Sequence, residues 1–221
     1  MKHINVTRIP ACYYITLLFL ALLVTATQAQ NNPGKVAGAP GQVSPALIGS
    51  ELPDVKIKNS EGEYLSLQKV GSGKPAVLVF YRGGWCPYCS KQLSGLAQIR
   101  SDITDMGYQL LGISMDKPST IREHQSKQDL TFPLYSDHEA NAVKALGIAY
   151  RVPQKTVESY LENGIDLEGA SGRSHHILPV PTVLIVDGKG KILFKYANPD
   201  YQVRLEPDVL ISAAKAYYPG K

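Results

Sequence analysis

The chain has 221 residues, 44% of which are hydrophobic, and a formal net charge of +4. This length accommodates one domain with a short extension, and the apolar fraction is sufficient for a packed core. The positive charge is scattered, without a basic stripe that alternates with aromatic residues, which argues against nucleic acid as a partner.

The first 29 residues have the order of a secretory signal peptide. Lys2, His3 and Arg8 give a positive start, residues 11–24 are almost entirely apolar, and small residues lead to a cleavage point after Ala29. An uncleaved membrane anchor is the alternative, but the apolar stretch is shorter than the roughly 20 residues that a spanning helix needs. We therefore predict export to the periplasm or secretion, with no stable membrane insertion after cleavage.

Cleavage would also remove Cys12, so the mature chain would hold only Cys86 and Cys89, separated by two residues. An exported protein with many cysteines suggests a disulfide scaffold, whereas one pair that closes a very small ring adds little stability. Reactivity explains this pair better than architecture does.

The segment that follows, residues 30–44, is rich in glycine, proline and alanine, which is typical of a flexible leader. We therefore expect the folded domain to occupy residues 45–221. It opens with alternating apolar and polar residues at 55–58 and 64–67, on either side of turn residues 59–62. This pattern predicts a β-hairpin.

A continuous apolar run at 76–81 predicts a strand that is buried on both faces. Beyond it, predicted strands alternate with helices. The strands are expected at 109–114, 131–135, 182–186 and 191–196. The helices are expected at 89–106, 140–146 and 207–217, and a further helix is expected to start at a capping box formed by Thr120 and Glu123. This order predicts a three-layer α/β domain with a mixed central sheet and helices on both faces. Residues 151–176 fit less well and indicate an insertion that contains a helix at 154–161.

The two cysteines stand where the buried strand turns into a helix. Unpaired N–H groups and the positive end of the helix dipole favour a thiolate there, and Arg82 brings a positive charge nearby in sequence. Pro87 suits the first helical turn, where its missing N–H is not needed. The thiolate is the nucleophile in disulfide exchange and in peroxide reduction, and the spacing lets Cys89 reach back to a mixed disulfide at Cys86.

Two inert interpretations of the pair compete with this one. Structural zinc sites have closed four-ligand sets, so a zinc site would need two ligands besides the cysteines. The only candidates are His175 and His176, which are adjacent in sequence. A purely structural disulfide would contribute little, because the ring is so small. We expect neither a metal nor a cofactor.

Pro181 lies immediately before a predicted buried strand. A proline cannot donate to a central ladder, so it marks a turn, the start of a strand or a cis bond. The residues alone leave these alternatives open.

Several segments resemble the redoxin or AhpC/TSA (alkyl hydroperoxide reductase/thiol-specific antioxidant) group of the thioredoxin superfamily. They are Phe80–Cys89, Val180–Thr182 and Leu184–Asp187, together with 164–167 and 197–201, which resemble features of a peroxiredoxin-like subgroup. The similarity covers about residues 45–217. It implies a thioredoxin-like fold, and it implies that Pro181 is a cis-proline packed against the cysteine pair.

Within that superfamily the residues support two readings. In peroxiredoxins a threonine precedes the peroxidatic cysteine by three residues, so Cys89 takes the peroxidatic position, Cys86 takes that of the threonine, and Arg82 that of a family proline. The arginine that peroxiredoxins place before the late strand has no clear replacement near Pro181, although Arg173 is close in sequence.

Thioredoxin-like reductases instead need a Trp-Cys-x-x-Cys helix start and a cis-proline, and the chain matches both motifs. The buried acid that assists proton transfer in thioredoxins is not identifiable, with Asp116 only a weak candidate.

The sequence thus favours a thiol–disulfide oxidoreductase in which Cys86 attacks and Cys89 resolves, forming a Cys86–Cys89 disulfide. Trp85 and Tyr88 flank the pair, and Pro181 shapes the substrate groove. Its partners would be protein thiols and disulfides or a thioredoxin-like electron donor. The alternative is a thiol peroxidase with Cys89 peroxidatic and Cys86 resolving. A third reading is a redox-inactive binding module.

Overall fold

The structure, a computed structural model, describes residues 34–71 and 73–217. The predicted signal peptide, residues 1–29, and the start of the leader lie outside the described residues. In the part that is described, no helix has both the length and the apolar character to cross a membrane.

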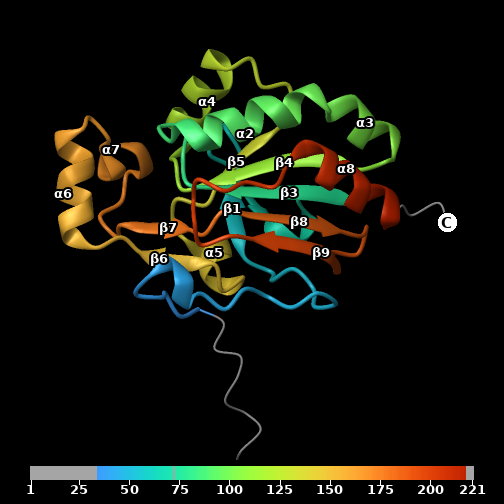
Figure 1. Ribbon diagram of the computed structural model, residues 1–221, viewed down its shortest axis with the longest axis horizontal. Helices are drawn as coiled ribbons and strands as arrows, with labels where there is room; N and C mark the ends of the chain where they lie inside the picture. Colours follow the sequence, from blue (N-terminus) through green and yellow to red (C-terminus); the bar gives the residue numbers. More distant parts are fainter. Residues whose placement is uncertain (1–33, 72, 218–221) are drawn as a thin grey trace, which may run out of the picture. The chain divides into compact units, whose positions relative to one another are not determined.

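A seven-stranded mixed sheet forms the centre of the described unit (Figure 1). Its order is β2 (Tyr64–Ser66), β1 (Lys56–Lys58), β5 (Leu134–Ser136), β4 (Gln109–Ser114), β3 (Ala76–Tyr81), β8 (Thr182–Val186) and β9 (Ile192–Ala197). The central strand β3 pairs in parallel with β4 and antiparallel with β8. The predicted hairpin is formed by β1 and β2.

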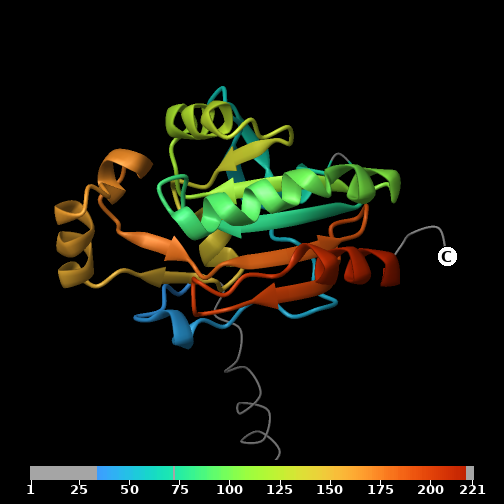
Figure 2. The same ribbon diagram turned by 45° about the horizontal axis from the view of Figure 1, so that its top comes forward.

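Every residue of β3 is buried, because alternate side chains enter hydrophobic clusters on opposite faces of the sheet. Val77 and Val79 face a cluster that includes residues of four helices: α2 (Pro87–Gln98), α3 (Arg100–Asp105), α4 (Pro118–Lys127) and α8 (Pro207–Ala216). Leu78 and Phe80 face a cluster that includes α5 (Asn141–Ala145) and the segment before β1. Figure 2 shows α2, α3 and α4 together over one face of the sheet. The predicted three-layer architecture is therefore confirmed.

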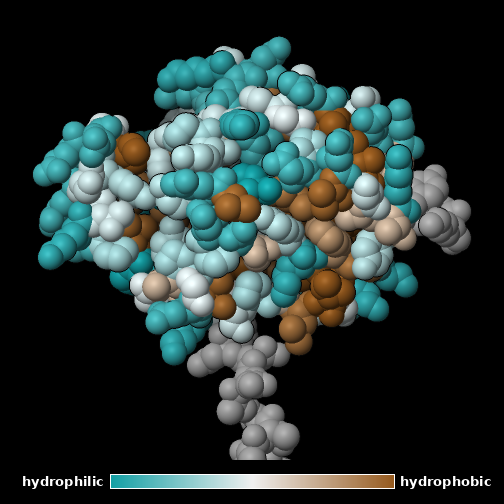
Figure 3. Space-filling view, viewed as in Figure 1, coloured by the Kyte–Doolittle hydropathy of each residue, from teal (hydrophilic) through white to brown (hydrophobic). Residues whose placement is uncertain are grey.

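The predicted insertion has a structure of its own. Strands β6 (Ala149–Arg151) and β7 (Ile177–Pro179) pair antiparallel in a separate two-stranded sheet. Between them, α6 (Gln154–Glu162) and α7 (Leu167–Ser171) project at one end of the molecule (Figure 1). We call residues 152–176 the arm. Its surface is mostly hydrophilic in Figure 3.

Part of the predicted leader, residues 30–44, belongs to the folded domain. Ala37 donates a backbone hydrogen bond to Ala149 (2.9 Å) and accepts one from Arg151 (2.9 Å), while Ser44 donates to Gly147 (3.1 Å). Residues 37–44 are therefore fixed to β6 and the turn before it. The segment shows no apolar periodicity because backbone hydrogen bonds attach it, and only isolated side chains, Ala37 and Val43, pack against the core.

Two helix boundaries also differ. The helix expected at 89–106 is two helices that meet at Ile99. The helix expected to start at the Thr120 capping box starts at Pro118 instead. Proline suits the first turn because its missing N–H would have no intrahelical partner there.

Candidate active site

The two cysteines lie at the predicted junction, where β3 ends at Tyr81 and α2 begins at Pro87. Cys86 caps the N-terminus of α2, and its carbonyl accepts hydrogen bonds from the N–H groups of Cys89 (3.0 Å) and Ser90 (3.0 Å). Both thiols are free and buried. The first turn of α2 therefore places the two sulfurs on the same side of the helix.

Two guanidinium groups reach the sulfurs. Arg82 Nη1 lies 3.9 Å from the Cys86 sulfur. Arg204, from the loop between β9 and α8, places Nη2 3.3 Å from the sulfur of Cys89 and 4.0 Å from that of Cys86. Hydrogen bonds from charged donors are stronger than neutral ones, so this arrangement favours a thiolate.

Aromatic rings hold Arg82 in this buried position. Its guanidinium carbon lies 4.1 Å from the ring centre of Tyr201 and 4.8 Å from that of Trp85. Its Nη2 donates to the Tyr160 hydroxyl at 2.5 Å. Ring faces attract cations, and the hydroxyl accepts one of the five donors. Trp85 also packs against Tyr160, whose helix α6 belongs to the arm.

The different surroundings of the two thiols shift their pKa values in opposite directions. A hydrogen bond from the Cys89 side chain, with smaller contributions from Arg82 and Arg204, lowers the pKa of Cys86 to about 6, although burial opposes the shift. Burial raises the pKa of Cys89 well above its usual range. At neutral pH the pair therefore carries one negative charge, on Cys86, and one proton, on Cys89.

This difference predicts the pH dependence of alkylation. Only the thiolate reacts with iodoacetamide, so the rate at Cys86 should rise with pH, reach half its maximum near pH 6 and level off above pH 7. Peptide mass spectrometry at each pH measures the rate at each cysteine separately. A Cys86 rate still rising between pH 8 and 9 would contradict the assignment.

Asp116, the weak candidate from the sequence, is fully buried behind the cysteine loop, just beyond β4. Its Oδ2 accepts hydrogen bonds from the Gly84 N–H (2.7 Å) and the Ser114 hydroxyl (3.2 Å), whereas Oδ1 has no hydrogen-bond partner among the described residues. Burial raises the pKa of Asp116 to about 7. A Cβ at Gly83 would overlap the Trp85 indole and the Asp116 carboxylate, so only glycine fits there.

Replacing Asp116 with asparagine should stabilise the protein at alkaline pH. Between its unfolded pKa near 4 and its folded pKa of about 7, Asp116 is protonated only in the folded state. The free energy of unfolding therefore falls with rising pH by up to about 1.4 kcal/mol per unit. Asparagine removes this dependence. In urea denaturation, Asp116→Asn should therefore raise the free energy of unfolding above that of wild type by more at pH 8 than at pH 5. The exposed Asp105→Asn is the matched control, and equal gains for the two variants would refute the expectation.

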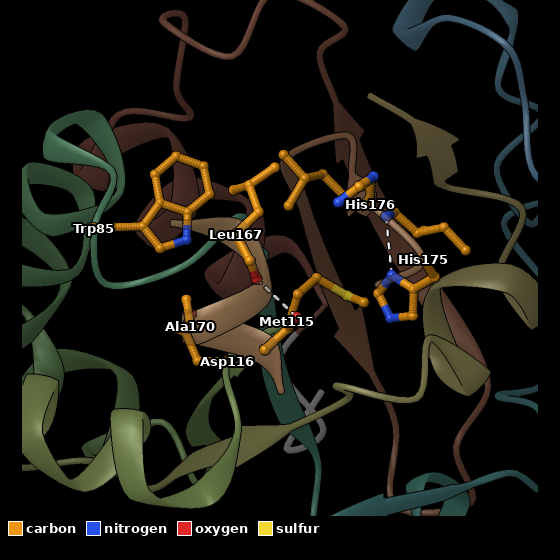
Figure 4. Close-up of a pocket in the computed structure, with 10 residues that line it drawn as sticks. Trp85, Met115, Asp116, Leu167, Ala170, His175 and His176 are labelled. Carbon is orange, nitrogen blue, oxygen red and sulfur yellow. Dashed lines mark hydrogen bonds between the residues drawn. The ribbon is translucent and has the colours of Figure 1, made fainter. Parts of the chain in front are cut away.

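A small cavity lies behind Trp85, between the end of β4 and the arm (Figure 4). Asp116, Ala170 of α7, His175 and His176 are among the residues that line it. Its volume of about 10 Å³ is close to the room that one water molecule needs. His175 hydrogen-bonds to the His138 carbonyl (2.9 Å) and His176 to the Glu168 carboxylate (2.7 Å).

The other predicted residues are distributed around the pair. Tyr88 is exposed and its ring meets that of Tyr201 edge to face, with centres 5.7 Å apart. Pro87 occupies the first turn of α2, as expected. Arg173 pairs with Glu139 at 3.3 Å instead of approaching the sulfurs.

The predicted cis bond at Pro181 is wrong, because no peptide bond among the described residues is cis. The trans bond keeps the chain extended where β7 continues into β8. Pro181 is buried, and its carbonyl accepts a hydrogen bond from the N–H of Asn198 (3.2 Å). Its role in shaping a substrate groove stays a prediction.

Sequence reasoning missed three residues of this site: Tyr160, Tyr201 and Arg204. The only signal was the similarity of 197–201 to the peroxiredoxin-like subgroup. That segment includes Tyr201 and lies in the same loop as Arg204, but it ends before Arg204. Nothing in composition or spacing distinguishes Arg204 from the other basic residues.

Curated relatives of the chain are peroxiredoxins. Peroxiredoxin Bcp of Escherichia coli strain K12 is 27% identical over 106 residues, which are 48% of this chain and 67% of that protein. Chloroplastic peroxiredoxin Q of Populus jackii is 34% identical over 96 residues, which are 43% of this chain and 44% of that protein.

Solved structures show the same fold. Reduced Prx3 from Vibrio vulnificus matches with a TM-score of 0.64 at 14% identity, over 77% of this chain and 99% of that one. Peroxiredoxin Q from Xanthomonas campestris matches with a TM-score of 0.59 at 18% identity, over 77% and 98%. These likenesses confirm the predicted thioredoxin-like fold. A sequence model of the AhpC/TSA family matches residues 48–195, which is well over half of the chain, and the chain therefore belongs to the AhpC/TSA family.

Proposed function

We propose that the protein is a thiol peroxidase that reduces hydroperoxides with Cys86 and Cys89. The position of Arg204 carries the proposal. The sequence shows no clear arginine near Pro181 that could activate a peroxide. In the structure, the guanidinium of Arg204 lies within reach of both sulfurs. Such a group stabilises the negative charge that develops on a peroxide oxygen. The peroxiredoxin relatives support the same substrate class.

The reaction runs in two steps. The Cys86 thiolate attacks one peroxide oxygen and the O–O bond breaks, so that Cys86 becomes a sulfenic acid. The other oxygen takes a proton from the solvent and leaves as an alcohol, or as water when the substrate is hydrogen peroxide. The sulfur of Cys89 then attacks the sulfur of Cys86. The S–O bond breaks, the hydroxide takes up the proton of Cys89 and leaves as water, and the disulfide forms. An external thiol donor returns the two electrons.

Disulfide exchange, which the sequence favoured, is the second candidate. The lowered pKa of Cys86 at the N-terminus of α2 supports it, because the same thiolate would attack a protein disulfide and Cys89 would release the product. The two candidates share the same oxidised and reduced forms and differ in the substrate.

Two assays on the purified protein separate these candidates. One measures consumption of hydrogen peroxide and cumene hydroperoxide with dithiothreitol as donor, and the other measures reduction of insulin disulfides. We expect peroxide turnover to be the faster reaction. Efficient insulin reduction without peroxide consumption would establish the second candidate and refute the first.

We also propose that the enzyme acts outside the cytoplasm. The proposal rests on residues 1–29 alone. Expression of the full chain, cell fractionation and N-terminal sequencing test it. A mature protein that begins at Gln30 is expected, whereas an intact N-terminus in the cytoplasmic fraction would refute export.

A further inference from the structure

We propose that Arg82 and Arg204 make the Cys86–Cys89 pair an oxidising couple, whose disulfide readily takes electrons from ordinary small thiols. We call these two residues the guanidinium clamp. The proposal rests on the proposed redox function of the pair, and it adds the direction of electron flow and the chemical class of the donor.

Among the residues that the structure describes, neither guanidinium of the clamp has a carboxylate partner. The carboxylates that contact basic side chains there are Glu139, next to Lys58, His138 and Arg173, and Glu168, next to His176. Asp116, the acid behind the cysteine loop, is bound to Gly84 and Ser114 instead. The dithiol is therefore the anion available to both arginines.

The remaining contacts of the clamp are neutral. Arg204 donates through Nε to the carbonyl of Tyr201 (2.7 Å) and through Nη1 to Oε1 of Gln92 (3.0 Å). Arg82 is only 2% exposed, and its Nε has no partner among the described residues. A buried charge without a counter-ion is costly, so the Cys86 thiolate stabilises Arg82 as much as Arg82 stabilises the thiolate.

Oxidation removes this anion. A disulfide carries no charge, so it leaves two cations near each other without compensation, whereas reduction restores a thiolate between them. Stabilising the reduced form of a dithiol raises its reduction potential. With a small thiol RSH, the exchange is one enzyme disulfide and two RSH giving RSSR, the enzyme with one thiolate and one thiol, and one released proton.

The arm takes part through Tyr160. Its hydroxyl accepts a hydrogen bond from Arg82 Nη2, while Nη1 of the same guanidinium faces the sulfur of Cys86. The fork geometry of the guanidinium couples the two contacts. Tyr160 is thus a positioning residue, and loss of its hydroxyl should loosen Arg82 without removing any charge.

The test is the redox equilibrium of the purified protein with glutathione buffers at pH 7, read from the fraction of oxidised protein. Arg82→Met and Arg204→Met should each favour the disulfide severalfold over wild type, up to a limit of about tenfold, which is about 30 mV for a two-electron couple. Tyr160→Phe should shift the equilibrium in the same direction by less, and Arg204→Lys, which keeps the charge, should shift it less than Arg204→Met. Arg100→Met, which removes an exposed arginine at the start of α3, should leave it unchanged.

Circular dichroism establishes that each variant is folded, and Arg204→Lys keeps the test decisive if Arg82→Met does not fold. Folded Arg→Met variants that equilibrate like wild type would overturn the proposal, as would equal shifts for Arg204→Met and Arg100→Met. The measurement needs no peroxide. A protein that fails to consume hydroperoxides but shows the predicted shifts refutes the peroxidase proposal and leaves the clamp intact.

Discussion

Serine at position 86 should abolish hydroperoxide turnover, whereas serine at position 89 should allow one reduction and then stop. Cys86 holds the negative charge of the pair, and a serine hydroxyl cannot replace the thiolate as nucleophile. Loss of an enzyme's nucleophile removes most of its rate enhancement, so steady-state turnover should fall by about a thousandfold or more. In Cys89→Ser the first step is intact, but no second thiol is present to displace the hydroxide.

Stopped-flow peroxide consumption and dimedone trapping measure the two outcomes. Cys89→Ser should consume one equivalent of peroxide and carry a dimedone adduct on Cys86, while Ser94→Ala, an exposed position of α2, should behave as wild type. The opposite pattern, with a single turnover in Cys86→Ser and none in Cys89→Ser, would make Cys89 the attacking sulfur. That is the order that the peroxiredoxin motif positions imply.

Arg204→Met should lower the second-order rate constant for hydroperoxide reduction by about a hundredfold. Its guanidinium approaches both sulfurs and is placed to bind the peroxide oxygen on which charge develops. Removal of one such donor costs about 100- to 1000-fold in other enzymes. The variant should also shift the pH profile of the reaction upward, because the charge of Arg204 helps to lower the pKa of Cys86.

Rapid-mixing kinetics with hydrogen peroxide across pH 5 to 9 test this expectation. Arg204→Lys should recover part of the rate by restoring the charge without the planar fork, and Arg100→Met should retain the wild-type rate. A rate constant for Arg204→Met within twofold of wild type would show that Arg204 does not act on the peroxide.

The location of the reactive pair is predictable because its signals are local. A buried strand, a short loop and a Pro at the first helical turn lie within a dozen residues, so the sequence places Cys86 and Cys89 at a helix N-terminus. The electrostatic partners are not local. Arg204 and Cys86 are 118 residues apart, and their contact depends on how the loop before α8 crosses the end of α2.

The arm shows the same limit. The sequence predicts its helix, at 154–161, but not the role of that helix, because the hydroxyl of Tyr160 meets Arg82 only after β6 and β7 pair. The packing of residues 37–44 is likewise not predictable from the sequence, since backbone hydrogen bonds attach the segment and only isolated side chains, Ala37 and Val43, pack against the core. The asymmetry between the two thiols also required the structure, because burial and contact with each other separate their pKa values.

The reaction of the reduced protein with one equivalent of hydroperoxide shows whether Cys86 and Cys89 form a peroxidase site. After the donor thiol is removed, intact mass and peptide mapping report the state of both sulfurs, and the alcohol product is quantified. We expect one alcohol per protein and a Cys86–Cys89 disulfide, seen as the loss of two hydrogens. Unconsumed hydroperoxide with both thiols still reduced, in a protein that reduces insulin, would refute the peroxidase function.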